Sequence, residues 1–137
     1  DAQESRGLGD VYKRQIIFSI RRLAEPMKDH IDNNFSPLSP VQKDDFGKVS
    51  EQIISFLRNC AIMIRKNDYI GFEELIAESI TLMNQLTALK KGELKRIQGQ
   101  SGSTKVSMVY LNMVQEAQNV VSFTANLLKV SRKFQKE

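Results

Sequence analysis

The sequence predicts an all-α protein: an antiparallel up-down bundle of three long helices, plus a shorter N-terminal helix that a proline interrupts. Apolar residues recur at helical spacing, i, i+3, i+4 and i+7, over three long stretches of the chain. Short connections join these stretches, which favours antiparallel neighbours. Alternating apolar and polar residues, the pattern of a strand, never persist. With 137 residues, the chain is long enough for one domain with its own core.

Residues 1–15 differ from the rest of the chain. They lack helical periodicity, and Gly7 and Gly9 stand close together. Residues 5–15 resemble a translated sequencing adapter, and the alternative is a disordered native tail. We therefore expect 1–15 to be a non-native or disordered leader and 16–137 to be the folded domain. The first residue is not Met, so we interpret the chain as a fragment.

The first predicted helix covers residues 16–33. Pro26 lies inside it and should kink the helix or break it near Glu25. The apolar residues that share one face are Ile16, Ile20, Leu23, Met27 and Ile31.

The second predicted helix, 40–67, has the clearest start signal. Ser39 can cap it, Pro40 takes the first helical position, and Gln42 completes a capping box. Its apolar row consists of Phe46, Val49, Ile53, Phe56, Leu57, Cys60, Met63 and Ile64. Asn67 and Asp68 form a tight connection, and Asp68 is a candidate cap for the next helix.

The third predicted helix covers 69–98, and residues 99–102 form the turn into the fourth. Its apolar row consists of Phe72, Leu75, Ile76, Leu82, Met83, Leu86, Leu89 and Ile97. The fourth helix, 103–135, contains neither Gly nor Pro. Its apolar row consists of Val106, Val109, Tyr110, Met113, Ala117, Val120, Val121, Leu127 and Leu128. We expect Met113 in the core and Gln118 on the surface.

Composition is that of an ordinary helical domain. The net charge is +4, but the Lys and Arg residues are spread along the chain and no basic block is interleaved with aromatics, so no nucleic acid is expected as a partner. Cys60 is the single cysteine, which excludes an intramolecular disulfide, and we expect it to be a small buried side chain. No apolar run is long enough to span a membrane in this fragment.

The candidate metal ligands are few. Glu74 and Glu78 lie one helical turn apart and form half of a carboxylate site, although acidic residues early in a helix also complement its dipole. His30, the single histidine, stands between Asp29 and Asp32, where a polar helix end is the simpler interpretation. No catalytic triad and no phosphate-binding glycine loop is present, so we expect neither enzymatic activity nor a cofactor.

Two stretches resemble a known family. Residues 66–78, KNDYIGFEELIAE, resemble the helix–helix junction of PhoU-like domains, and residues 110–116, YLNMVQE, resemble the Tyr-Leu-Asp-Ile-Leu start of their last helix. The resemblance covers about 16–135. The arrangement is close to the cytosolic C-terminal region of PiT-type inorganic phosphate transporters, particularly in Bacteroidetes-like sequences. It implies a PhoU-like bundle at the cytoplasmic face of the bacterial inner membrane, with the missing transmembrane part of the same transporter as its partner.

The family's acidic metal motif is altered here. Gln118 and Ser122 occupy its positions in the last helix, and Asn112 replaces the usual Asp. Neutral amides and a hydroxyl lack the anionic oxygens that hard cations and transition-metal cations prefer. Glu74 and Glu78 alone have a counterpart among the family's acidic pairs. The resemblance therefore implies the fold and its context, with at most a weak metal site.

The function expected from these observations is a non-catalytic regulatory or assembly domain of an inorganic phosphate transporter. In that case residues 16–20 continue from the membrane part. The alternatives are a free-standing PhoU-type accessory regulator, and a helical scaffold or dimerisation bundle without a transport role. A homo-oligomer formed through helix faces is a further expected partner. Transmembrane spans upstream of Ile16 favour the first function, and a start Met near it favours the second.

Overall fold

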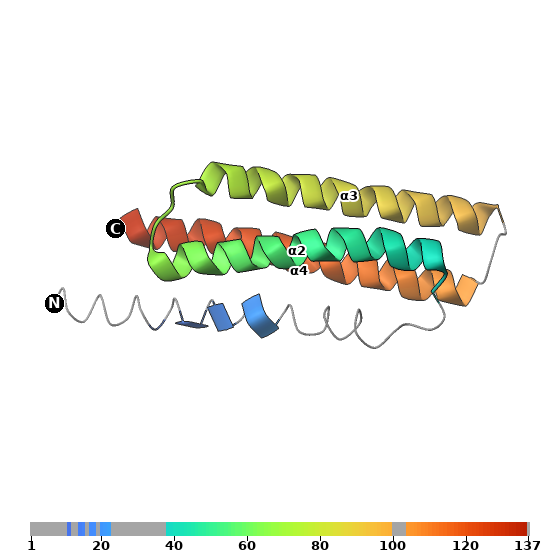
Figure 1. Cartoon of the computed structure of the whole chain (residues 1–137), viewed down its shortest axis with the longest axis horizontal. Helices are drawn as coiled ribbons and strands as arrows, with labels where there is room; N and C mark the ends of the chain where they lie inside the picture. The colour runs from blue at the N-terminus through green and yellow to red at the C-terminus, as the bar shows by residue number, and fades with distance from the viewer. Residues whose placement is uncertain are drawn as a thin grey trace.

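The computed structural model describes residues 38–99 and 104–136, together with residues 11, 14, 15, 17, 18 and 20–22 of the N-terminal segment. Three long helices make up the main body: α2 at Pro40–Lys66, α3 at Phe72–Gln98 and α4 at Thr104–Lys136 (Figure 1). Their 27, 27 and 33 residues make them the dominant elements of the structure. At a rise of about 1.5 Å per residue, α4 is about 50 Å long.

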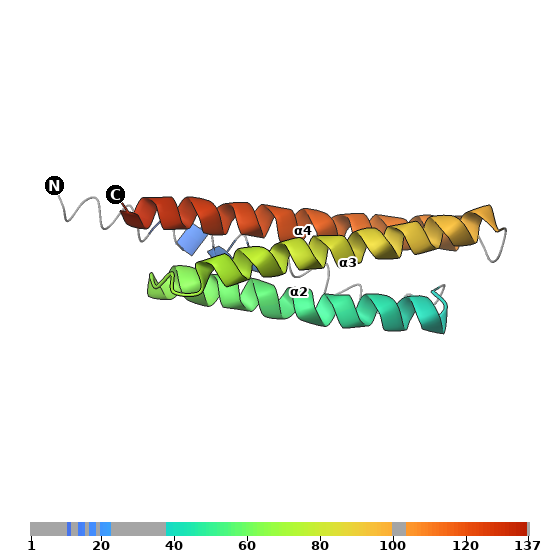
Figure 2. The ribbon, with the colours of Figure 1, turned by 90° about the horizontal axis from the view of Figure 1, so that it is seen from above.

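The three helices form an antiparallel up-down bundle. α2 and α4 run in the same direction and α3 runs against both, as Figures 1 and 2 show from two sides. Each helix contacts both of the others, and the α3–α4 contact is the most extensive. The all-α bundle predicted from sequence is confirmed, and no strand occurs among the described residues. Within that part of the chain, no helix combines the length and apolar character needed to cross a bilayer.

The predicted start of α2 is confirmed in detail. Ser39 has extended backbone and is the N-cap, and Pro40 follows at the first helical position. The Gln42 backbone N–H donates to Ser39 Oγ at 3.2 Å, and the Ser39 N–H donates to Gln42 Oε1 at 2.9 Å. This reciprocal pair satisfies two donors that a helix start otherwise leaves without a partner.

The connection between α2 and α3 differs from its prediction. Asn67 adopts the left-handed conformation (φ 55°), which ends α2 at Lys66. Its N–H donates to the carbonyls of Met63 and Ile64. Gly71 (φ 88°), not Asp68, is the N-cap residue of α3, so the helix begins at Phe72 rather than at residue 69. Asp68 instead accepts the Ile70 N–H at 3.1 Å within the loop. The prediction of Asp68 as the cap was wrong.

The apolar rows form the core where the three helices meet. All eight predicted residues of α2 are buried, and so are Met113, Tyr110 and most of the predicted row of α4. On α3, Phe72, Leu75, Leu82 and Leu86 are buried, while Ile76, Met83 and Leu89 are partly buried against the core. Val114 and Ala125 are buried too, although they lie outside the predicted row of α4. α4 packs against two helices, which widens its buried face beyond one narrow row.

Gln118 is buried, so its predicted position on the surface was wrong. It projects from α4 toward α3, where its amide N–H₂ donates to Thr87 Oγ1 at 3.1 Å and lies 3.5 Å from the Met83 carbonyl oxygen. A polar side chain is compatible with this buried position because α3 offers it hydrogen-bond acceptors.

The described residues of the N-terminal segment lie beside the C-terminal halves of α2 and α4 (Figures 1 and 2). Its described residues are helical, and they include Val11, Arg14 and Gln15 of the predicted leader. Ile20 is 2% exposed and belongs to the core, and Ile17 packs against that core. The predicted break at Pro26 and the end of this helix lie outside the described residues.

Candidate functional site

The most deeply buried charged side chain that the structure describes is Glu93, on the last third of α3. It is 1% exposed. The surrounding sequence is rich in Lys and Arg, as is typical of a solvated helix C-terminus, and nothing in it distinguishes Glu93 from a surface residue. A carboxylate loses several kcal/mol of solvation when it is buried, and it therefore needs donors around it.

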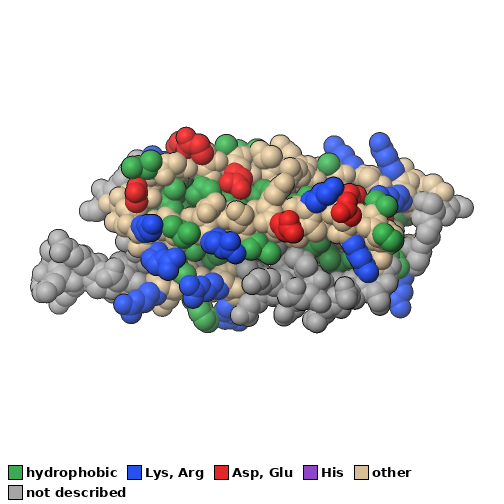
Figure 3. Space-filling model, viewed as in Figure 1, with side chains coloured by type: hydrophobic (Ala, Val, Ile, Leu, Met, Phe, Trp, Pro, Cys, Tyr) green, Lys and Arg blue, Asp and Glu red, His purple; other side chains and the backbone are tan. Residues whose placement is uncertain are grey.

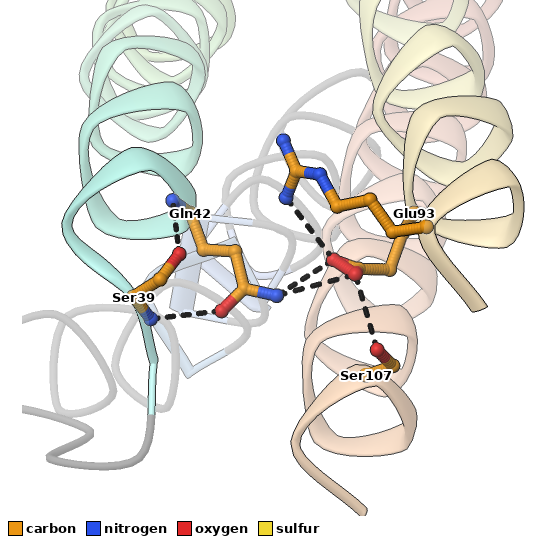
Figure 4. A network of polar contacts seen from close by, with 5 residues as sticks. Ser39, Gln42, Glu93 and Ser107 are labelled. Carbon is orange, nitrogen blue, oxygen red and sulfur yellow. Dashed lines mark hydrogen bonds and ion pairs between the residues drawn. The ribbon is translucent and has the colours of Figure 1, made fainter. Parts of the chain in front are cut away.

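Four contacts surround the Glu93 carboxylate, and they come from all three helices (Figure 4). The Gln42 Nε2 group of α2 donates to Oε1 at 2.6 Å and lies 3.2 Å from Oε2. The Ser107 hydroxyl of α4 donates to Oε2 at 3.2 Å. An Arg96 guanidinium N–H donates to Oε1 at 3.3 Å.

Gln42 uses both ends of its amide. Its Oε1 accepts the Ser39 N–H of the capping box, while its Nε2 reaches across to Glu93 (Figure 4). This assignment gives each amide atom a partner of the right polarity. The start of α2 is thus hydrogen-bonded to the end of α3 through one buried side chain.

Tyr110 of α4 lies in the same region of the bundle. Its ring makes an edge-to-face contact with Phe46 of α2, with centroids 6.3 Å apart. Burial, together with the negative charges of Asp45 and Glu93, raises the pKa of the Tyr110 hydroxyl to about 12, although the positive charge of Arg96 opposes this shift. The phenol therefore stays protonated at neutral pH beside the buried carboxylate.

The Glu93 cluster, formed by Glu93, Gln42, Ser107 and Arg96, is built to hold helices together. Two carboxylate oxygens offer about four acceptor positions, and the four contacts here place two donors on each oxygen. Gln42 belongs to α2, Glu93 and Arg96 belong to α3, and Ser107 belongs to α4. The arrangement therefore fixes the relative positions of α2, α3 and α4 at the end of the bundle where α2 begins.

The candidate metal residues Glu74 and Glu78 lie far from this cluster, near the start of α3. Glu74 is exposed and Glu78 is half-buried. Among the described residues, no three His, Cys, Asp or Glu side chains gather into a metal site. The candidate ligands Asp29, His30 and Asp32 lie outside the described residues. Ser122 and Asn112, at the altered family positions, are exposed on α4.

Two carboxylates on one helix leave most of a cation's coordination shell to water, so any metal bound there is expected to be lost easily. Protein purified without added metal and passed through a desalting column should retain far less than one equivalent. Plasma mass spectrometry measures this directly. A stoichiometric metal that disappears in the Glu74→Gln, Glu78→Gln double variant would show that these residues form a real site.

Cys60 of α2 is fully buried, as predicted. Burial, with a smaller contribution from the negative charge of Glu78, raises the pKa of its thiol from 9.0 to about 12. The thiolate is disfavoured only in the folded state, because the unfolded chain exposes the thiol to water. The contribution of this pKa shift to the free energy of unfolding is therefore complete below pH 9 and is lost as the pH rises toward 12. The thiol is therefore inert at neutral pH.

The free energy of unfolding should accordingly fall between pH 9 and pH 11, with a slope that approaches about 1.4 kcal/mol per pH unit for each proton that only the unfolded chain releases. Urea titrations at several pH values would measure this slope. In Cys60→Ala the decline should be shallower by about one proton, and Tyr110→Phe should have a similar effect from pH 10 upward. An unchanged slope in both variants would contradict the assignment.

No protein-family model, no curated protein and no solved structure matches the chain.

Proposed function

We propose that this chain is a non-catalytic regulatory or assembly domain of an inorganic phosphate transporter, at the cytoplasmic face of the bacterial inner membrane. The link to phosphate transport rests on the resemblance of residues 66–78 and 110–116 to PhoU-like domains. The three-helix body of the bundle is consistent with that resemblance. Such a domain acts through the relative positions of its helices rather than through bond chemistry.

The observation that carries this proposal is the packing of the N-terminal segment. Ile20 is buried in the core of the bundle and Ile17 packs against it. In the proposed transporter, the membrane part joins the bundle through this segment. A movement of the segment then has to disturb the packing of the core, because close-packed interiors have little free volume. The bundle and the membrane part would be coupled mechanically in both directions.

The Glu93 cluster supports the same interpretation from the other end of the bundle. Burial of the Glu93 carboxylate costs solvation energy. Its hydrogen bonds to donors on α2, α3 and α4 fix the arrangement of the three helices. A rigid bundle transmits a displacement of one helix to the others. This property suits a domain that senses or sets the state of an attached transporter.

Uptake of labelled phosphate by cells that lack their own phosphate transporters would test the proposal with the full-length gene. Removal of residues 16–137 should change uptake while the membrane part still inserts, and Ile20→Ala should alter uptake in the same direction. Ile80→Ala, at an exposed position of α3, is the matched control and should have no effect. Unaltered uptake after removal of the whole bundle would refute a regulatory or assembly role.

The sequence upstream of Ile16 in that gene separates the alternatives. Transmembrane spans there would support the transporter domain. A start Met near Ile16 would favour a free-standing PhoU-type accessory regulator. A different upstream domain without membrane spans would favour a scaffold or dimerisation bundle.

A further inference from the structure

α4 carries a second apolar row in its C-terminal half. Phe123, Leu127, Val130 and Phe134 follow one another at i, i+4, i+7 and i+11, which places them on one face of the helix. Leu127 packs partly against the core. Phe123, Val130 and Phe134 are 48%, 45% and 57% exposed. We call these four residues the outer row of α4.

The outer row lies in a part of the molecule with strongly positive charge. From Ala117 to Lys136, α4 contains no Asp or Glu but four basic residues: Lys129, Arg132, Lys133 and Lys136. The second half of α2, residues 54–66, likewise contains Arg58, Arg65 and Lys66 and no acidic residue. α2 and α4 stop at the same end of the bundle (Figure 1), so the basic side chains of both helices contribute to the positive charge there.

Among the described residues, the acidic side chains at this end are Asp68, in the loop before α3, and three glutamates of α3. Glu73, Glu74 and Glu78 lie in its first two turns. Figure 3 shows Lys and Arg side chains gathered over the end where α2 and α4 stop, and the Asp and Glu side chains of that end on the α3 side. Arg132 bridges the two sides, because it pairs with Glu73 at 3.2 Å and its guanidinium carbon lies 4.3 Å from the centre of the Phe72 ring. Lys129 and Lys133 are exposed.

The N-terminal segment adds the same combination of side chains. Arg21 and Arg22 are exposed, and Phe18 is exposed with the Arg22 guanidinium 5.9 Å from the centre of its ring. Figures 1 and 2 place the described residues of this segment beside the C-terminal halves of α2 and α4, the second of which carries the outer row.

We propose that the outer row of α4, flanked by Lys129 and Lys133, binds the surface of a bilayer that contains anionic phospholipids. Aromatic and branched side chains on one helix face can enter the boundary between head groups and acyl chains, while long basic side chains extend to the phosphates. The Lys and Arg side chains that α2 and α4 carry at this end attract an anionic membrane surface before contact. The proposal does not depend on the link to phosphate transport.

Other binding partners fit this surface less well. A nucleic acid would require basic residues that track a backbone, with aromatics available for stacking. Here the row itself contains no basic residue, and Lys129 and Lys133 lie together on one side of it. An acidic protein helix would match the charge but would not by itself explain three large apolar side chains that remain exposed on a single row. A membrane surface matches both the charge and the apolar row.

The test is flotation of the full chain with lipid vesicles. The protein should float with vesicles of phosphatidylcholine that contain a large fraction of phosphatidylglycerol, and it should remain behind with pure phosphatidylcholine. Raising the salt concentration should weaken the binding, because it screens the charge. Phe123→Ser with Val130→Ser removes the apolar contact, and Lys129→Glu with Lys133→Glu reverses the adjacent charge. Each pair should lower the partition coefficient at least about tenfold.

The matched controls lie on α3. Ile80→Ser changes an apolar side chain that is 58% exposed, and Lys91→Glu reverses an exposed charge. Both should bind vesicles like the original protein. Equal binding to neutral vesicles, or unchanged binding in both paired variants, would overturn the proposal. So would a dimer in sedimentation velocity that the paired variants dissociate, since the outer row would then bind a second copy of the chain.

Discussion

Replacement of Glu93 by alanine is expected to lower the free energy of unfolding by about 3 kcal/mol. The substitution removes the acceptor for Gln42 Nε2 and for Ser107 Oγ, and both of these residues are buried. A buried donor that loses its partner costs about 1–3 kcal/mol. Arg96 is partly exposed, so its guanidinium turns to water and adds little to the loss. Urea titration monitored by circular dichroism would measure the change.

Two further variants give this result its meaning. Glu93→Gln keeps the size of the side chain but replaces one acceptor oxygen with an N–H₂ group, so it should lose about half as much stability. Glu51→Ala removes an exposed glutamate of α2 and should cost less than about 0.5 kcal/mol. If Glu93→Ala costs no more than Glu51→Ala, the cluster does not hold the helices together.

Met113→Ala is expected to cost about 2–5 kcal/mol, because the side chain is buried in the core and its removal leaves a cavity. Gln118→Ala should cost about 1–2 kcal/mol, since a buried amide and its bond to Thr87 are lost. The surface position predicted for Gln118 from sequence would have cost less than about 1 kcal/mol. Urea titrations of both variants would decide. Losses below about 1 kcal/mol for both variants would mean that neither side chain is buried and that the rotation of α4 about its axis is wrong.

The sequence was most informative where local chemistry determines structure. Ser39, Pro40 and Gln42 are only three residues apart at their widest, so their capping box needs no knowledge of the rest of the fold. The apolar row of α2 is equally local, since one periodic face predicts burial whichever helix covers it. Both predictions are confirmed residue by residue.

Prediction failed where a residue's role depends on a distant partner. Glu93 stands between basic residues and looks like a surface residue until Gln42, 51 positions away in the chain, reaches it. Gln118 is likewise accommodated in a buried position because Thr87 of α3 lies beside it at the same level along the bundle axis and accepts its hydrogen bond. Asp68 was predicted as a cap from residue type alone, whereas the left-handed backbone at Asn67 and Gly71 delays the start of α3. These outcomes depend on the positions of the helices relative to one another along the bundle axis, which a hydrophobic pattern does not specify.

The double use of Gln42 has a consequence for how the bundle opens. The first turn of a helix usually frays by itself, and its amide hydrogens then exchange with solvent at little cost in free energy. In α2, the side chain that completes the cap is also hydrogen-bonded to Glu93. Opening the first turn therefore requires the cap and the contact with α3 to break together. The Lys43 amide, which donates to the Ser39 carbonyl at 3.0 Å, should be protected from exchange almost as strongly as amides in the centre of the bundle.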